Sequence, residues 1–127
     1  AAEIVDEFSF LDDWEDRYQL LIDLGRQLPP LPDIYHKDEY QLRGCQSVVH
    51  FAAEREGDEI RFHAGSDAAI VQGLIALLIR VYSQRTPDEI LSTDAQFLAE
   101  IGLDSHLSAT RKTGLASMMS AIKASAG

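Results

Sequence analysis

The feature that most constrains the fold is a block of alternating residues, 48–64, which lies between segments with helical spacing. Its first half divides between two faces of an extended strand, with Val49, Phe51 and Ala53 on one face and Val48, His50 and Ala52 on the other. The alternation breaks at Gly57 and Asp58, and it resumes with Ile60 and Phe62 on one face. This pattern predicts a β-hairpin over the block.

A third strand is expected just before the hairpin, where Tyr40 and Leu42 supply a short extended run. So small a sheet cannot form a core alone, and helices must cover one of its faces. The helical segments lie before and after the strands rather than alternating with them, an order that indicates an α+β fold. The whole chain, 1–127, is expected to be a single domain.

Two helices are expected to contribute to the core. The first begins at Asp12, which can form a capping-box pair with Glu15, and it ends before Pro29. The second covers residues 68–82 and is apolar nearly all round, so it is expected to be the buried central helix. Gly73, in its middle, costs about 1 kcal/mol against alanine, so it is expected to let another backbone come close.

Further helix boundaries follow from capping signals. Ser66 or Asp67 can cap the central helix, and the sequence "TPDE" starts another at residues 86–89. Asp94 is expected to start a short helix that Gly102 ends. A last helix has Ser108 as its cap and an apolar stripe made of Leu115, Met118, Met119 and Ile122.

The net charge of the chain limits the kinds of molecule that it is expected to bind. The chain has 11 Lys and Arg residues against 21 Asp and Glu residues, a formal net charge of −10. Such a balance repels phosphate backbones and anionic lipids, so no nucleic-acid or membrane partner is expected. The charge would suit a protein partner with a basic docking surface, but solubility alone explains it. The acidic N-terminal segment lacks the pattern of a signal peptide, and a cytoplasmic location is expected. The oligomeric state stays open, a homodimer included.

Familiar metal-binding and catalytic patterns are missing from the sequence. The chain has four histidines, none with HExxH or His–Cys metal spacing: His36, His50, His63 and His106. His50 and His63 lie on facing strands and can meet across the sheet, but the role expected for them is an exposed strand face. The sequence has no glycine-rich phosphate loop and no nucleophile-elbow serine. We therefore expect neither a metal nor a cofactor.

Cys45 is the only cysteine and the main candidate for chemistry. A lone cysteine is more often a buried structural thiol than a nucleophile. Here Gly44 indicates a turn, and Arg43 and Gln46 place polar groups beside the sulfur, a setting in which a thiol can be accessible and partly ionised. From these residues alone both interpretations stay open, because no spacing identifies a catalytic base.

Arg111 is a second candidate. It lies in the first turn of the last expected helix, where the helix dipole disfavours a cation by about a few tenths of a kcal/mol. Either this arginine is simply solvated, or it holds an acidic neighbour or meets an anionic sulfur.

Taken together, several segments make the chain resemble the SufE family of sulfur-acceptor proteins, which includes the close paralogue CsdE. The matching segments run in family order from about Trp14 to Ile122: "LIDLGRQLPPLP", "LRGCQSVV", "GSDAAIVQGLIALLI", "TPDEIL" and "HLSATRKTGLASMMSAI". "CQS" and "SDAAIV" resemble SufE itself, and "WEDRY" resembles CsdE.

The resemblance implies a small antiparallel sheet packed by helices, the fold shared with the scaffold protein IscU. It implies that Cys45 takes persulfide sulfur from a pyridoxal-phosphate cysteine desulfurase of the SufS or CsdA type and passes it to an iron–sulfur scaffold. The chain would be a persulfide-carrying activator, not an enzyme with its own substrate. A scaffold of the IscU type uses three cysteines, and this chain has one, so the scaffold role does not carry over.

Two further residues match family positions. Asp67 matches an acidic residue near the cysteine and Arg111 matches a family arginine, so both are candidates for positioning the Cys45 segment or docking the partner. Helix capping is the alternative for Asp67, and Arg43 departs from the small polar residues usual there. Two other hypotheses remain: an interaction module with a structural Cys45, and a redox-sensing thiol. Resting Cys45 is expected to be shielded by apolar neighbours.

Overall fold

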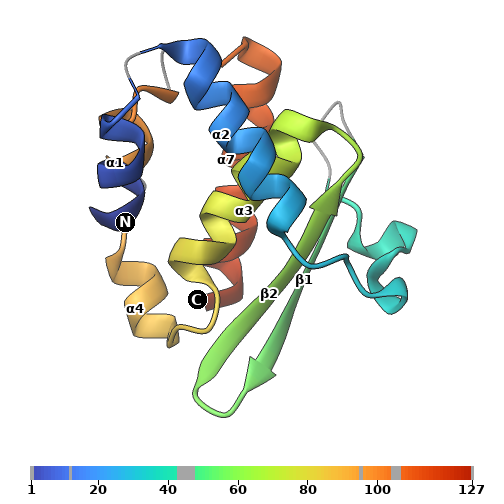
Figure 1. The fold of residues 1–127 in the computed structure, drawn as a ribbon. Helices are drawn as coiled ribbons and strands as arrows, with labels where there is room; N and C mark the ends of the chain where they lie inside the picture. The colour runs from blue at the N-terminus through green and yellow to red at the C-terminus, as the bar shows by residue number, and fades with distance from the viewer. Residues whose placement is uncertain (1, 12, 43–47, 95, 104–106, 127) are drawn as a thin grey trace.

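A computed structural model describes the chain except for residues 1, 12, 43–47, 95, 104–106 and 127. Its elements are α1 (Ala2–Ser9), α2 (Trp14–Gln27), the 3-10 turns η1 (Asp33–Tyr35) and η2 (Asp38–Tyr40), β1 (Val49–Glu56), β2 (Glu59–Ser66), α3 (Ala69–Tyr82), α4 (Pro87–Ser92), α5 (Gln96–Glu100) and α7 (Ala109–Ala126). Figure 1 shows α2, α3 and α7 on one side of the hairpin and the 33–42 segment on the other. The α+β class expected from the sequence is confirmed.

The hairpin forms as the alternation predicts. β1 and β2 are antiparallel, with Val49 opposite Ser66 at one end and Glu56 opposite Glu59 beside the turn. Ile60 and Phe62 both lie on the helix-facing side and are each only 3% exposed. Their burial against α3 and its neighbours supplies the hydrophobic contact that a two-stranded sheet needs to be stable.

The expected third strand is wrong. Tyr40 belongs to η2, and within the described residues the sheet has only the order β1–β2. What remains of the pairing is one antiparallel bridge between Gln41 and His50, with the Leu42 N–H donating to the Val49 carbonyl at 2.8 Å. Two successive 3-10 turns lie within residues 33–40, so only Gln41 and Leu42 run alongside the strand.

Helices α2 and α3 cross at two glycines, as expected for Gly73. A Cβ built on Gly73 would lie 2.3 Å from the Leu21 carbonyl oxygen, and one built on Gly25 would lie 2.8 Å from the Gly73 nitrogen. Leu21 and Leu77 are fully buried. The crossing therefore depends on backbone against backbone, with leucines of both helices filling the surrounding core.

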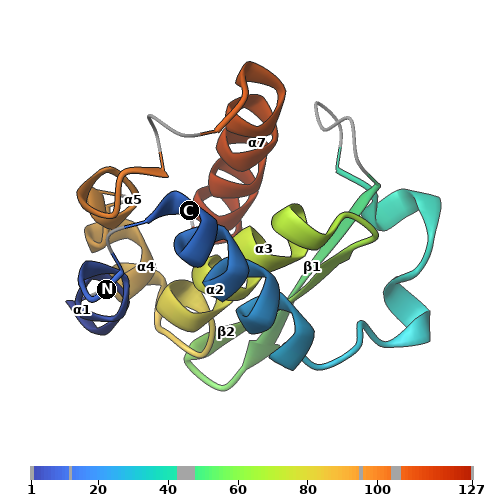
Figure 2. The ribbon, with the colours of Figure 1, turned by 45° about the horizontal axis from the view of Figure 1, so that its top comes forward.

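A helix that the sequence pattern did not predict begins the chain. Ile4 and Phe8 of α1 are each 1% exposed, so an acidic segment contributes two core residues. Arg80 of α3 holds α1 from outside through Glu7 at 2.6 Å and Glu3 at 3.3 Å. Figure 2 shows α1 beside α4 and α5, at the end of the molecule away from the 33–42 segment. None of the described helices meets the length and hydropathy needed to span a bilayer.

The predicted capping residues are confirmed for some helices, and for others a neighbouring residue caps the helix. Thr86 and Glu89 form the full capping box of α4, and Ser108 accepts a hydrogen bond from the Arg111 N–H at the start of α7. For α2 the capping side chain is Asp13, which accepts from the Glu15 N–H at 2.9 Å; the expected cap, Asp12, lies outside the described residues. Gly102, with φ of 80°, follows α5 as expected.

The glycine crossing gives a stability prediction. Alanine normally stabilises a helix interior by about 1 kcal/mol over glycine, but in Gly73→Ala the new methyl group meets the Leu21 carbonyl. We expect a net loss of about 2 kcal/mol or more in the free energy of unfolding, measured by urea denaturation.

Gly65→Ala is the matched control, since its added Cβ would meet nothing closer than the Leu31 Cβ at 3.5 Å. This variant should stay within about 1 kcal/mol of the parent protein. Equal stability of the Gly73 and Gly65 variants would contradict the close crossing of the two helices.

Candidate functional site

The segment that carries Cys45 is fixed at both of its ends. Cys45 itself, with Arg43, Gly44 and Gln46, lies outside the described residues, and so does the expected shielding of the thiol. The chain leaves the described structure at Leu42 and returns at Val48. Because the Leu42 N–H donates to the Val49 carbonyl at 2.8 Å, the two ends are held side by side. The hairpin thus provides a firm base for the residues between them.

Aromatic rings hold the approach to this segment against the hairpin. Tyr35 stacks on His63 with ring centroids 4.9 Å apart, and His36 lies 5.4 Å from His50. Both histidines lie on the face of the hairpin away from α3, where η1 and η2 cover it. The sequence analysis missed this role, although the ring-rich sequence "DIYHKDEY" before the cysteine could have indicated it.

The two strand histidines do not lie directly opposite each other, and the strand face that was expected to be exposed is covered by the 33–42 segment. The register pairs His50 with Gly65 and His63 with Ala52, and each histidine contacts a ring of the 33–42 segment instead. The His63 ring also lies 3.4 Å from the Glu54 carboxylate. No group of three or more His, Cys, Asp or Glu side chains in the described part of the chain could hold a metal ion.

Asp67 lies beside the end of the Cys45 segment. The pairing of Val49 with Ser66 places the next residue, Asp67, next to Val48, where the chain returns. Its expected capping role is wrong. The N-cap of α3 is Ala68, which has no capping side chain, and the Ala68 N–H bonds to the Ser66 hydroxyl at 3.2 Å. Asp67 is exposed, so its carboxylate can meet a partner.

Arg111 also presents its charge to solvent. It is exposed in the first turn of α7, where its backbone N–H donates to the Ser108 hydroxyl at 3.2 Å. Across the described residues no ion pair joins Arg111 to an acidic side chain, and none joins it to Asp67. The strand register places Asp67 beside the end of the segment, and Arg111 is exposed in the first turn of α7.

The shifted pKa values belong to structural contacts elsewhere. Burial raises the pKa of Tyr82 to about 12, with the Asp94 charge adding to the shift. A hydrogen bond from the Thr86 backbone, followed by one from its side chain, lowers the pKa of Glu89 in the capping box. Burial acts to lower the pKa of Arg80, but its bonds to Glu7 and Glu3 outweigh burial and raise it. None of these groups marks a catalytic centre.

The class of protein now follows from fold and site: a small α+β protein in which a hairpin and its covering turns hold one cysteine-bearing segment. Comparison with known proteins gives the family. The family model named SufE, described as an Fe–S metabolism associated domain, matches residues 2–126. The chain belongs to the SufE family, as the sequence resemblance indicated.

Relatives and a solved structure agree with this assignment. An uncharacterized SufE-like protein of Rhizobium meliloti (strain 1021) is 40% identical over 129 residues, covering 98% of this chain and 92% of the relative. One from Rhizobium etli is 40% identical over 126 residues, covering 95% and 85%. The solution structure of a hypothetical protein from Thermus thermophilus has a TM-score of 0.80 at 22% identity, covering 98% and 91% of the two chains. That structure supports the fold alone.

The position of Asp67 gives a prediction. Since Asp67 does not cap α3, Asp67→Ala should change the free energy of unfolding by no more than about 0.5 kcal/mol. Thr86→Ala removes a true cap and should cost about 1 kcal/mol under the same conditions. Urea denaturation of both variants compares them directly. A loss in Asp67→Ala as large as that in Thr86→Ala would restore the capping role.

Proposed function

We propose that this protein accepts sulfur from a pyridoxal-phosphate cysteine desulfurase on Cys45 and delivers it for iron–sulfur cluster assembly. Membership of the SufE family, associated with Fe–S metabolism over residues 2–126, supports the metabolic context. The observation that carries the proposal is the bond between Leu42 and Val49, which fixes both ends of the segment holding the only cysteine. A thiol on a short segment with a fixed base can enter a partner's site with little loss of conformational entropy.

The proposed transfer is a thiol exchange at sulfur. The Cys45 thiolate attacks the outer sulfur of the persulfide on the desulfurase cysteine, and a new S–S bond forms on Cys45. The old S–S bond breaks, and the desulfurase cysteine leaves as a thiolate with the electron pair of that bond. The exchange has no net oxidation, so it needs no cofactor on this chain. Removing the persulfide frees the desulfurase for the next substrate, so this protein acts as an activator and not as an enzyme.

Two exposed side chains have proposed roles in docking. Asp67 is exposed beside the end of the segment, and Arg111 is exposed in the first turn of α7. We assign both to contacts with a desulfurase of the SufS or CsdA type, and we assign Arg43, Gly44 and Gln46 to the immediate setting of the thiol. Delivery to an iron–sulfur scaffold follows in the same cytoplasmic pathway.

A test replaces the proposed sulfur-bearing atom. Cys45→Ser keeps the size of the side chain but removes the nucleophile, so stimulation of a SufS-type desulfurase should fall to the rate of the desulfurase alone. The assay follows alanine release from L-cysteine with saturating carrier protein. Undiminished stimulation by the serine variant would rule out carriage on Cys45.

The matched control moves the single thiol to another place on the surface. Ser120 is exposed on α7, so the double variant Cys45→Ser with Ser120→Cys retains one accessible cysteine. It should stimulate no more than Cys45→Ser, because only the segment after Leu42 presents sulfur to the partner. Recovery of stimulation in the double variant would show that position is irrelevant and would contradict the proposed site.

A further inference from the structure

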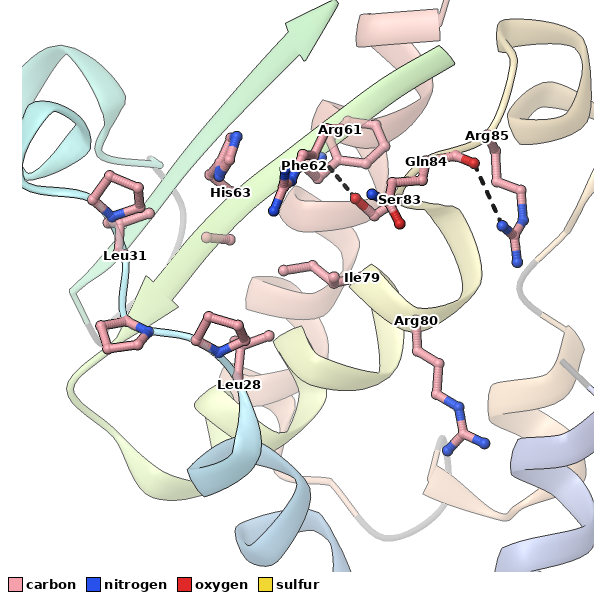
Figure 3. A pocket seen from close by; sticks show the side chains of 14 residues that line it. Leu28, Leu31, Arg61, Phe62, His63, Ile79, Arg80, Ser83, Gln84 and Arg85 are labelled. Carbon is pink, nitrogen blue, oxygen red and sulfur yellow. Dashed lines mark hydrogen bonds between the residues drawn. The ribbon is translucent and has the colours of Figure 1, made fainter. Parts of the chain in front are cut away.

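A second site lies on the hairpin edge, and we call it the edge groove. Its cavity of about 480 Å³ is bounded by β2, by residues 28–32 and by the end of α3 with the turn that follows (Figure 3). This volume falls within the roughly 300–1,000 Å³ of ligand pockets. Of the residues described above around the Cys45 segment, only His63 also lines the edge groove.

The groove opens on an incomplete strand edge. The Ile60 N–H and carbonyl pair with the turn after α3, through Arg85 and Gln84 at 2.8 Å each. The Phe62 N–H bonds to the Ser83 hydroxyl at 2.9 Å, and the Ser66 N–H bonds to the Gln72 side chain at 2.7 Å. Backbone direction alternates along a strand, so the N–H and carbonyl of Ala64 face this same edge.

Ala64 is the residue on this edge whose outward backbone groups lack a hydrogen bond within the described structure. It lines the groove, and no hydrogen bond from another described residue reaches its outward N–H or carbonyl. The facing wall contains Pro29, Pro30 and Pro32, which have no N–H to donate and cannot continue the sheet. The chain thus leaves one strand position unpaired beside a cavity, and an unpaired strand edge is a template for another chain.

The groove is basic within an acidic protein. Arg61, Arg80 and Arg85 line it, and no acidic side chain among the described residues does, although the chain carries 21 acidic residues. Arg80 is engaged by Glu7. Arg61 has only a half-exposed pair with Glu56 at 3.4 Å, which is easily exchanged. Arg85 forms no salt bridge in the described structure; its guanidinium donates to the Gln84 carbonyl at 3.4 Å, and its charge adds to the hydrogen bonds with Thr86 that lower the pKa of Glu89.

Gln84 adds an independent sign of function. Its φ of 58° lies in the left-handed region, where glycine would be the less strained residue. The chain nevertheless carries a glutamine there, and its side chain lines the groove. Backbone strain of this kind gathers at ligand sites, where a side chain is kept for its contacts.

We propose that the edge groove binds an extended acidic peptide segment of a partner protein. The segment adds to β2 beside Ala64, accepting from its N–H and donating to its carbonyl, and its carboxylates pair with Arg61 and Arg85. Gln84 supplies a further donor and acceptor at the end of the groove. This assignment does not depend on sulfur transfer by Cys45.

The test is a titration of the ¹⁵N-labelled protein with the peptide acetyl-Val-Glu-Val-Glu-amide, up to about 5 mM, the range of weak binding. The Ala64 amide signal should shift progressively, and its hydrogen exchange should slow as the N–H becomes bonded. Acetyl-Val-Lys-Val-Lys-amide, an acidic peptide with N-methylated backbone amides and sodium acetate at equal carboxylate concentration are the controls. None of them should reproduce the shift of Ala64.

Variants locate the binding on the groove. Arg61→Ala and Arg85→Ala should each weaken peptide binding by about three- to tenfold. Arg55→Ala, on the other strand and outside the groove, should leave it unchanged. Gln84→Gly relieves the left-handed strain and should fold normally yet bind more weakly.

Three results would overturn the proposal. An unmoved Ala64 signal excludes the site. An equal response to the lysine or N-methylated peptide excludes acidic strand addition. An equal response to acetate leaves only a free-anion site.

Discussion

The contact of Gly25 with Gly73 is the constraint from which the rest of the structure follows. It brings the backbones of α2 and α3 so close that no side chain fits between them, and α3 becomes the centre of the core. The position of α2 then sets where the proline segment begins. That segment passes Leu31 over Gly65 at the edge of β2 and carries the chain to the outer face of the hairpin (Figure 1).

From there, ring contacts and one backbone bond guide the chain to the cysteine segment. Tyr35 and His36 rest on histidines of the hairpin, and Leu42 closes on Val49. The hairpin is therefore a two-sided platform: its apolar face packs on α3, and its other face holds the approach to Cys45.

Sequence patterns predicted the parts of this structure that depend on local chemistry. The alternation predicted the hairpin and the shared face of Ile60 and Phe62, and the "TPDE" segment predicted the capping box of α4. Gly73 could be predicted as a close approach because glycine is unfavourable inside a helix. Its partner was not predictable from spacing, since the α2–α3 crossing joins residues about fifty positions apart.

The features that the sequence patterns failed to predict also have physical causes. Helix α1 was not predicted, because its segment is acidic and too short to establish an apolar periodicity. Its core residues Ile4 and Phe8 were therefore not recognised. A third strand was expected from two apolar residues, but two 3-10 turns occupy most of that stretch. The site residues came mainly from family resemblance. Asp67 was placed beside the segment by the strand register, which the sequence alone does not specify.

Direct detection of sulfur on Cys45 tests the central claim most directly. The protein is incubated with a pyridoxal-phosphate cysteine desulfurase and L-cysteine, separated without reductant, and analysed by intact and peptide mass spectrometry. Carriage predicts the added mass of one sulfur atom on the peptide containing Cys45, formed only with both desulfurase and L-cysteine and removed by dithiothreitol. A desulfurase that turns over while Cys45 stays unmodified would contradict the account.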